Sequence, residues 1–194
     1  MGTRSLTVFT DDKEEIVVMY RQMDGYISQH GKELAEFLQQ FDEITTGLRL
    51  GDERKLANGM GCLASQTIMH FKGNVKEYSY DKERVFDSST GIMGTPIREG
   101  HHAGGIYLQP AGTRDCGEEY IYYITEKKGS IHLRACFAGC PERIYGTETF
   151  PARADRVIFD GAISKWNLTD VLNREKTIVK QMDDEWKAEQ ELTQ

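Results

Sequence analysis

The sequence predicts an α+β fold in which two or three helices pack on one face of an antiparallel β-sheet. Three observations favour this class. Helical apolar stripes occur near residues 34–41 and 60–71 and at the C-terminus, and strand-like segments cluster at the start of the chain and between residues 104 and 162. Strands and helices segregate instead of alternating. The 194 residues suit a single domain, 1–194, with a loop insertion at 74–103.

The N-terminal elements are a hairpin and two helices. Residues 5–9 and 16–23 flank an acidic turn, and the apolar run from Ile16 to Tyr20 predicts that the second strand lies centrally in the sheet. The first helix is expected to begin after Ser28. Its apolar positions, and those of the second helix, recur at three and four residues, as on one helix face.

The second half of the chain reads as strands followed by a long helix. A hairpin is expected with a two-residue loop at Lys127–Lys128. Alternation then gives an apolar core face and an open polar face, and the latter carries Glu119, Tyr123, His132 and Arg134, with Glu119 close to Arg134. Polar side chains on an open face are usually only solvated. Asn167 caps the last helix, whose stripe is Val171, Ile178, Met182 and Trp186.

Composition excludes several classes of function. The net charge of -7 repels phosphate backbones, so non-specific nucleic-acid binding is not expected. No apolar run is long enough to span a membrane, and the first residues lack the core of a signal peptide, so we expect a cytoplasmic protein with free thiols. Phosphate-loop, dinucleotide, serine-elbow and paired-cysteine metal motifs are absent, and no metal or cofactor is expected.

The first candidate site is "GTRDCGEE", residues 112–119. Two glycines let the backbone approach a ligand closely, and Arg114 suits a phosphate or carboxylate. Asp115, Glu118 and Glu119 offer carboxylates for a water or a ribose hydroxyl. The alternative is a turn whose polar side chains bond to the backbone. Cys116 is a weaker candidate, because neighbouring carboxylates raise the pKa of a thiol.

The second candidate is "YRQMDGYISQHG", residues 20–31, which joins a strand to a helix start. Arg21, Asp24, Tyr26 and His30 fall at a rim where ligands often bind, and His30 lies near a helix N-terminus that favours anions. The alternative is a turn at Asp24 followed by a surface histidine.

Three segments together resemble a protein family: "YRQMDGYISQHGKELAEFL", "NGMGCLASQTIMHFK" and "GGIYLQPAGTRDCGEEYIYYI". The chain resembles small uncharacterised proteins encoded by tailed phages and by bacteria, especially actinobacteria. The resemblance covers roughly residues 16–73 and 104–137, and residues 74–103 look like an insertion. It implies a phage-type accessory protein that acts inside a bacterial host cell, and it implies no activity.

The leading functional hypothesis is a non-enzymatic binder of a small anionic, nucleotide-like ligand or of a host factor. Arg21, Arg114 and Arg134 would hold the anion, and Tyr26 or Tyr123 would stack on a base. The alternative is a hydrolase or nucleotide-processing enzyme that uses Asp24, His30, Asp115 and Glu118 beside Arg114. A third reading is a protein–protein interaction module, and the C-terminal helix with Trp186 makes a homodimer our expectation.

Overall fold

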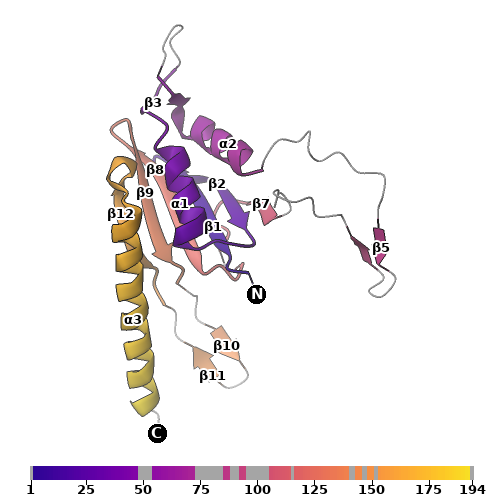
Figure 1. Ribbon diagram of the computed structural model, residues 1–194, viewed down its shortest axis with the longest axis vertical. Coiled ribbons are helices and arrows are strands. Elements are labelled where there is room, and N and C mark those ends of the chain that lie inside the picture. Colours follow the sequence, from indigo (N-terminus) through magenta and orange to yellow (C-terminus); the bar gives the residue numbers. More distant parts are fainter. Residues whose placement is uncertain are drawn as a thin grey trace.

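The computed structural model describes residues 2–47, 54–72, 85–87, 92–94, 105–114, 116–139, 143–145, 148–150 and 153–192. A mixed six-stranded sheet and three helices form its centre, which confirms the α+β class (Figure 1). The sheet order is β12-β9-β8-β1-β2-β7. These strands are β1 (Ser5–Asp11), β2 (Glu14–Arg21), β7 (Ile106–Gln109), β8 (Tyr120–Lys127), β9 (Ser130–Phe137) and β12 (Arg156–Ala162).

The remaining elements are helices and three small two-stranded sheets. A π-helical turn (Ile27–Gly31) leads into α1 (Lys32–Leu38), and α2 (Gly59–Lys72) and α3 (Leu168–Leu192) follow later in the chain, α3 after a 3-10 turn (Ile163–Lys165). The small sheets pair β3 (Glu43–Thr45) with β4 (Leu56–Asn58), β5 (Val85–Asp87) with β6 (Ile92–Gly94), and β10 (Arg143–Tyr145) with β11 (Glu148–Phe150).

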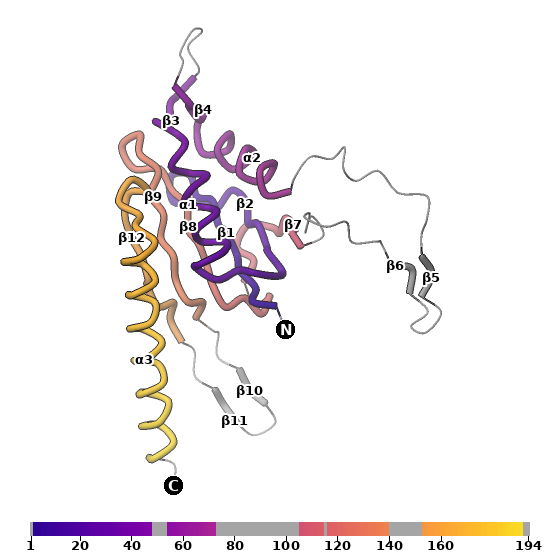
Figure 2. Tube along the Cα trace, viewed as in Figure 1, coloured from indigo at the N-terminus to yellow at the C-terminus, as the bar shows by residue number. Residues whose placement is uncertain are grey.

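The sheet is antiparallel except between β1 and β8, which run parallel. Figure 2 shows these two strands side by side although more than a hundred residues separate them in the sequence. The expected N-terminal hairpin is confirmed, since β1 pairs with β2. The second strand lies inside the sheet, between β1 and β7, with Val18 and Met19 fully buried, but its first residues are open, since Ile16 is 41% exposed.

The three helices pack against one face of the sheet, as the sequence predicts. This helix-side core contains Tyr122 and Ile124 of β8 and Leu133 of β9, together with residues of α1, α2 and α3. The opposite face has a smaller apolar cluster of Leu6, Val8, Val18 and Ile121. The sheet therefore has one face covered by helices and a second face that we call the open face.

The β8–β9 hairpin has the predicted faces but a different register. Its turn is Lys128–Gly129, so that Lys127 pairs with Ser130 and Tyr123 with Arg134. Both turn residues have positive φ, 54° and 79°, a conformation that glycine adopts without strain and that favours Gly129 over Lys127 in the turn. The slip is two residues, so every side chain keeps its predicted face. Glu119 consequently lies opposite Ala138 and not beside Arg134.

Two other expectations concern chain segments and helix ends. The first helix begins one residue before Ser28, as a wide π-helical turn and not as an α-helix capped by Ser28. Asn167 caps α3 as predicted, because its side-chain oxygen accepts the N–H of Asp170 at 3.1 Å.

Most of the 74–103 segment lies outside the described residues. Within the described residues, α3 and the other helices are too polar or too short to span a membrane.

Candidate functional site

A buried polar cluster underlies the motif of residues 20–31. Arg21, the last residue of β2, donates from Nη1 to Nδ1 of His30 at 2.9 Å and to Oε2 of Glu33 at 2.7 Å. Because a guanidinium can only donate, Nδ1 of His30 is an acceptor and its proton resides on Nε2. Nε2 then donates to Oγ1 of Thr7, also at 2.9 Å. Both ring nitrogens of His30 are therefore engaged.

His30 is fully buried and packs edge-on against the rings of Phe71 and Tyr122. Burial, and then the charge of Arg21, lower its pKa well below the usual value, so the imidazole is neutral at pH 7. The ring joins β1, β2 and the first helical segment through hydrogen bonds. This geometry gives His30 a role in packing and leaves no nitrogen for proton transfer to a ligand.

The neighbouring residues of the same motif shape the joint between strand and helix. Asp24 has a φ of 57°, and its carbonyl accepts the N–H of His30 at 3.2 Å. A Cβ on Gly25 would lie 2.8 Å from the backbone of Arg4, so only glycine fits beside β1. The Tyr122 hydroxyl donates to the Gly25 carbonyl at 2.9 Å. Tyr26 is partly buried against the helix-side core.

Arg114, in the motif of residues 112–119, is held by Glu15. Its two terminal nitrogens donate to the two carboxylate oxygens, and the N–H of Gly112 donates to Oε2 of Glu15 at 2.7 Å. Partial burial raises the pKa of Glu15, but the hydrogen bonds from Arg114 and Gly112 outweigh it and leave that pKa below its usual value. The guanidinium also lies 5.6 Å from the ring centroid of Tyr123.

The rest of this motif leads the chain into β8. Oε2 of Glu118 accepts the N–H of Cys116 at 2.7 Å, and the backbone N–H of the exposed Glu119 donates to the Arg4 carbonyl at 2.9 Å. Asp115 lies outside the described residues. The other motif contacts the same N-terminal segment, since the N–H of Gly25 donates to the Thr3 carbonyl. Residues 20–31 and 112–119 therefore both border residues 3 and 4. Their arginines, however, bind different carboxylates, Glu33 and Glu15.

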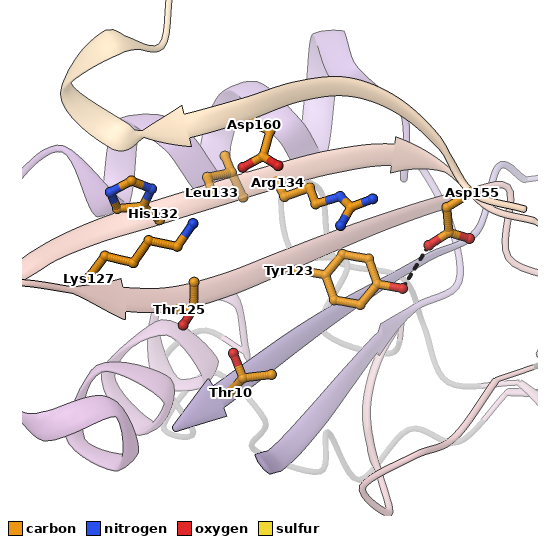
Figure 3. Close-up of a pocket in the computed structure, with 9 residues that line it drawn as sticks. All are labelled: Thr10, Tyr123, Thr125, Lys127, His132, Leu133, Arg134, Asp155 and Asp160. Atoms are coloured by element: carbon orange, nitrogen blue, oxygen red, sulfur yellow. Dashed lines mark hydrogen bonds between the residues drawn. The ribbon is translucent and has the colours of Figure 1, made fainter. Parts of the chain in front are cut away.

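A hollow of about 270 Å³ lies on the open face, and none of the four residues of the two arginine–glutamate pairs lines it, although Arg114 lies on the ring of its lining residue Tyr123 (Figure 3). Since Tyr122 and Ile124 point into the helix-side core, Tyr123 and Thr125 point the opposite way. The hollow is lined by residues of β1, β8, β9 and β12 and of the segment before β12: Thr10, Tyr123, Thr125, Lys127, His132, Leu133, Arg134, Asp155 and Asp160.

The hollow exists because long and short side chains alternate in rows across the strands. One row runs from Tyr123 through Arg134 to Asp160. The next row pairs Thr125 with His132 and His132 with Ala162. Small side chains on both sides of His132 leave space beside the taller row. Lys127, two residues beyond Thr125 on β8, bounds the other side, and its side chain extends along the face (Figure 3).

The cations of the hollow, unlike the arginines of the two motifs, are not held in ion pairs with described residues. In the described part of the chain, neither Lys127 nor Arg134 forms an ion pair within 4.0 Å, although Asp160 lies opposite Arg134 on β12. Arg134 lies 6.0 Å from the ring centroid of Tyr123. Two cations are thus available to an anion without breaking an ion pair first.

Both carboxylate oxygens of Asp155 already accept hydrogen bonds from other residues of the protein. Its Oδ2 accepts the Tyr123 hydroxyl and its Oδ1 accepts the Gly139 N–H, both at 2.8 Å. Burial, followed by the hydrogen bond to Asp155, raises the pKa of Tyr123 to about 12, so the phenol keeps its proton at neutral pH. This pair fixes the tyrosine ring at one end of the hollow.

His132 differs from His30 in its hydrogen bonds. Its Nδ1 atom is buried and has no hydrogen-bond partner among the described residues. Burial and the charge of Lys127 lower its pKa, and Asp160 opposes that effect. The ring is therefore neutral at pH 7, with one nitrogen that donates and one that accepts.

Sequence reasoning placed three of these residues, Tyr123, His132 and Arg134, on one polar face. It assigned Lys127 to the turn and left out the residues of β1 and β12. Alternation along β12 puts Asp160 and Ala162 on one face of that strand, and this pattern could have identified Asp160 from the sequence. Their approach to β9 depends on sheet order, which the sequence pattern does not contain.

Comparison with models of known protein families, with curated proteins and with solved structures found no match. Among the described residues, no cluster of three or more histidine, cysteine or carboxylate side chains is arranged to hold a metal ion. His132, Cys136 and Cys140 follow one another at intervals of four residues in the sequence, but Cys140 lies outside the described residues. The hollow therefore offers two cations, two carboxylates, hydroxyls, an imidazole and a phenol ring.

Proposed function

We propose that this protein is a non-enzymatic binding protein that holds a small anionic, nucleotide-like ligand in the open-face hollow. The observation that carries the proposal is the pair of cations, Arg134 and Lys127, at a hollow where no described carboxylate neutralises them by an ion pair. Arg21 and Arg114 would have to give up a glutamate to bind an anion. Arg134 and Lys127 would not.

The other lining groups favour a ligand that carries hydroxyls as well as an anion. Thr10, Thr125 and His132 line the hollow with polar side chains, and Asp160 is exposed and accepts hydrogen bonds. A phosphorylated sugar matches this set: its phosphate contacts Arg134 and Lys127, and its hydroxyls contact Asp160 and the threonines. The Tyr123 ring offers an apolar surface to a base.

The resemblance to phage and bacterial proteins supplies the context of the proposal. The protein would act as a phage-type accessory protein in the cytoplasm of a bacterial host, where signalling nucleotides are ligands of this chemical class. Sequestering such a ligand needs no catalytic group. The proposal therefore gives His30 no role in ligand binding, because both of its ring nitrogens form hydrogen bonds within the protein.

Isothermal titration calorimetry against cyclic and linear nucleotides, sugar phosphates and inorganic phosphate tests the proposal. We expect micromolar binding of at least one phosphorylated nucleoside, weaker binding of phosphate alone, and a loss of about tenfold or more in Arg134→Gln and in Lys127→Gln. Lys128→Gln is the matched control: it removes the same charge from the adjacent turn residue, which does not line the hollow.

Equal losses in Lys128→Gln and Lys127→Gln would show attraction to general positive charge and would contradict a site in the hollow. Absence of heat with every compound at high micromolar concentration would contradict the function itself. Circular dichroism of each variant excludes unfolding as the cause.

A further inference from the structure

The two halves of α3 have different environments. The helix has 25 residues and is roughly 37 Å long. In its first half Val171 and Ile178 are each 3% exposed and pack in the helix-side core. From Asp183 to Glu191 every residue is exposed, and this half extends past the end of β12 (Figure 1). Two ion pairs, Arg156 with Glu185 and Arg153 with Glu189, hold it against the body.

An apolar stripe runs along α3 next to its buried face. Leu172, Val179 and Trp186 recur every seven residues, and at 100° per residue they lie within about 40° of one another around the helix. Val179 is 42% exposed and Trp186 56% exposed. Met182, which lies between Val179 and Trp186 in the sequence, is partly buried against the helix-side core. Repetition at seven residues is the spacing with which two helices pack along a common seam.

The charge of α3 changes sign along its length. Residues 168–181 carry three cations and two carboxylates, a net charge of +1, whereas residues 182–192 carry one lysine and five carboxylates, a net charge of -4. Two helices of this kind packed in parallel would bring the two acidic halves together. Packed antiparallel, each acidic half lies beside the first half of the other helix.

We infer that a second copy of this chain docks along α3, antiparallel and about a two-fold axis near Val179. Leu172, Val179 and Trp186 form the seam, and a two-fold axis lets each copy bury the same patch. Lys176 and Asp183 are seven residues apart on the flank of the stripe, on the solvent side. In the antiparallel pair Lys176 lies beside Asp183 of the partner subunit, and the contact occurs twice.

Sedimentation equilibrium of the full chain over a concentration series tests the seam. We expect a monomer–dimer equilibrium whose Kd rises about thirtyfold or more in Trp186→Ala. Met69→Ala, which removes a side chain that is 69% exposed on α2, is the control and changes Kd less than twofold. A chain that stays monomeric to several hundred micromolar, or that dimerises equally well without Trp186, overturns the inference.

Charge reversal tests the antiparallel orientation separately. Lys176→Glu and Asp183→Lys each place like charges together at two symmetric contacts, so each raises Kd about tenfold at low salt. The double variant exchanges the charges and restores Kd to within about threefold of the original chain. A double variant as weak as either single one contradicts the orientation. The hollow takes no part in this contact, so ligand binding and dimerisation succeed or fail independently.

Discussion

Two histidines, one on each face of the sheet, show how differently similar residues are used. His30 is fully buried beneath the helices, and both of its nitrogens bond to protein groups, Thr7 and Arg21. His132 lines the open-face hollow, and its buried Nδ1 has no hydrogen-bond partner in the part of the chain that the structure describes. The first histidine is fully satisfied by the fold, whereas the second lines the hollow and has a buried nitrogen without a hydrogen bond to a described residue.

The arginines divide in the same way. Arg21 is paired with Glu33 and Arg114 with Glu15, whereas Arg134 beside Tyr123 has no ion pair in the described part of the chain. A dense group of charged residues in a sequence can therefore be an assembly that neutralises itself. The functional candidate is the place where a cation, Arg134, forms no ion pair among the described residues, although Asp160 lies opposite it on β12.

The largest expected effect comes from removing the buried histidine. His30→Ala deletes two hydrogen bonds, leaves Thr7 and Arg21 without that partner and opens a cavity beside Tyr122. We expect the free energy of unfolding to fall by about 3 kcal/mol, measured by urea denaturation. His132→Ala is the counterpart and should change it by about 0.5 kcal/mol or less. Equal losses in the two variants would remove the distinction between the two faces.

A second comparison uses adjacent tyrosines that point to opposite faces. The Tyr122 hydroxyl is buried and donates to the Gly25 carbonyl, so Tyr122→Phe leaves that carbonyl without its donor. We expect a loss of about 1.5 kcal/mol of stability. In Tyr123→Phe the freed Asp155 keeps the Gly139 hydrogen bond and access to water, and the loss should stay below about 0.7 kcal/mol. Chemical denaturation of both variants provides the check, and the reverse order would contradict the assignment of faces.

The pH dependence of stability gives a smaller effect with a defined sign. Burial lowers the pKa of His30 in the folded state, whereas the unfolded chain binds a proton below about pH 6.5. Between those two pKa values the unfolded state holds more protons, so stability falls as the pH falls. From pH 7.0 to 5.5 this histidine contributes a loss of about 1 kcal/mol.

His30→Gln isolates that contribution, because glutamine does not titrate. Its stability should fall less than that of the original chain over the same range, by about 1 kcal/mol. Parallel denaturation curves at the two pH values make the comparison. An identical pH dependence in the variant would mean that His30 is not the titrating group.

The sequence predicts the faces of the sheet better than its pairing. Alternation along 120–137 separates Tyr122 from Tyr123 correctly, because the side-chain period of a strand is independent of its neighbours. The hairpin register depends on which two residues adopt positive φ, and the glycine at 129 decides it. The parallel contact of β1 with β8 joins segments far apart in the chain, and no local pattern specifies it.

The candidate site was predictable only in part, for the same reason. Tyr123, His132 and Arg134 share a polar face that alternation reveals, but Thr10 and Asp160 come from strands placed by tertiary packing. The motif of residues 20–31 invites a functional reading because it gathers polar residues. Its glycines and its histidine are explained by contacts with Arg4, Tyr122 and Thr7, which the sequence pattern does not show.

The most direct test of the two-face account is an amide NMR titration with the nucleotide that binds best in calorimetry. We expect the largest shift changes at Tyr123, Thr125, His132 and Arg134 of the hollow, and small changes at Arg21 and His30 beneath the helices. A half-saturation point at the calorimetric Kd would link these shifts to the bound state. Large changes at Arg21 and His30, with the hollow unaffected, would contradict the account.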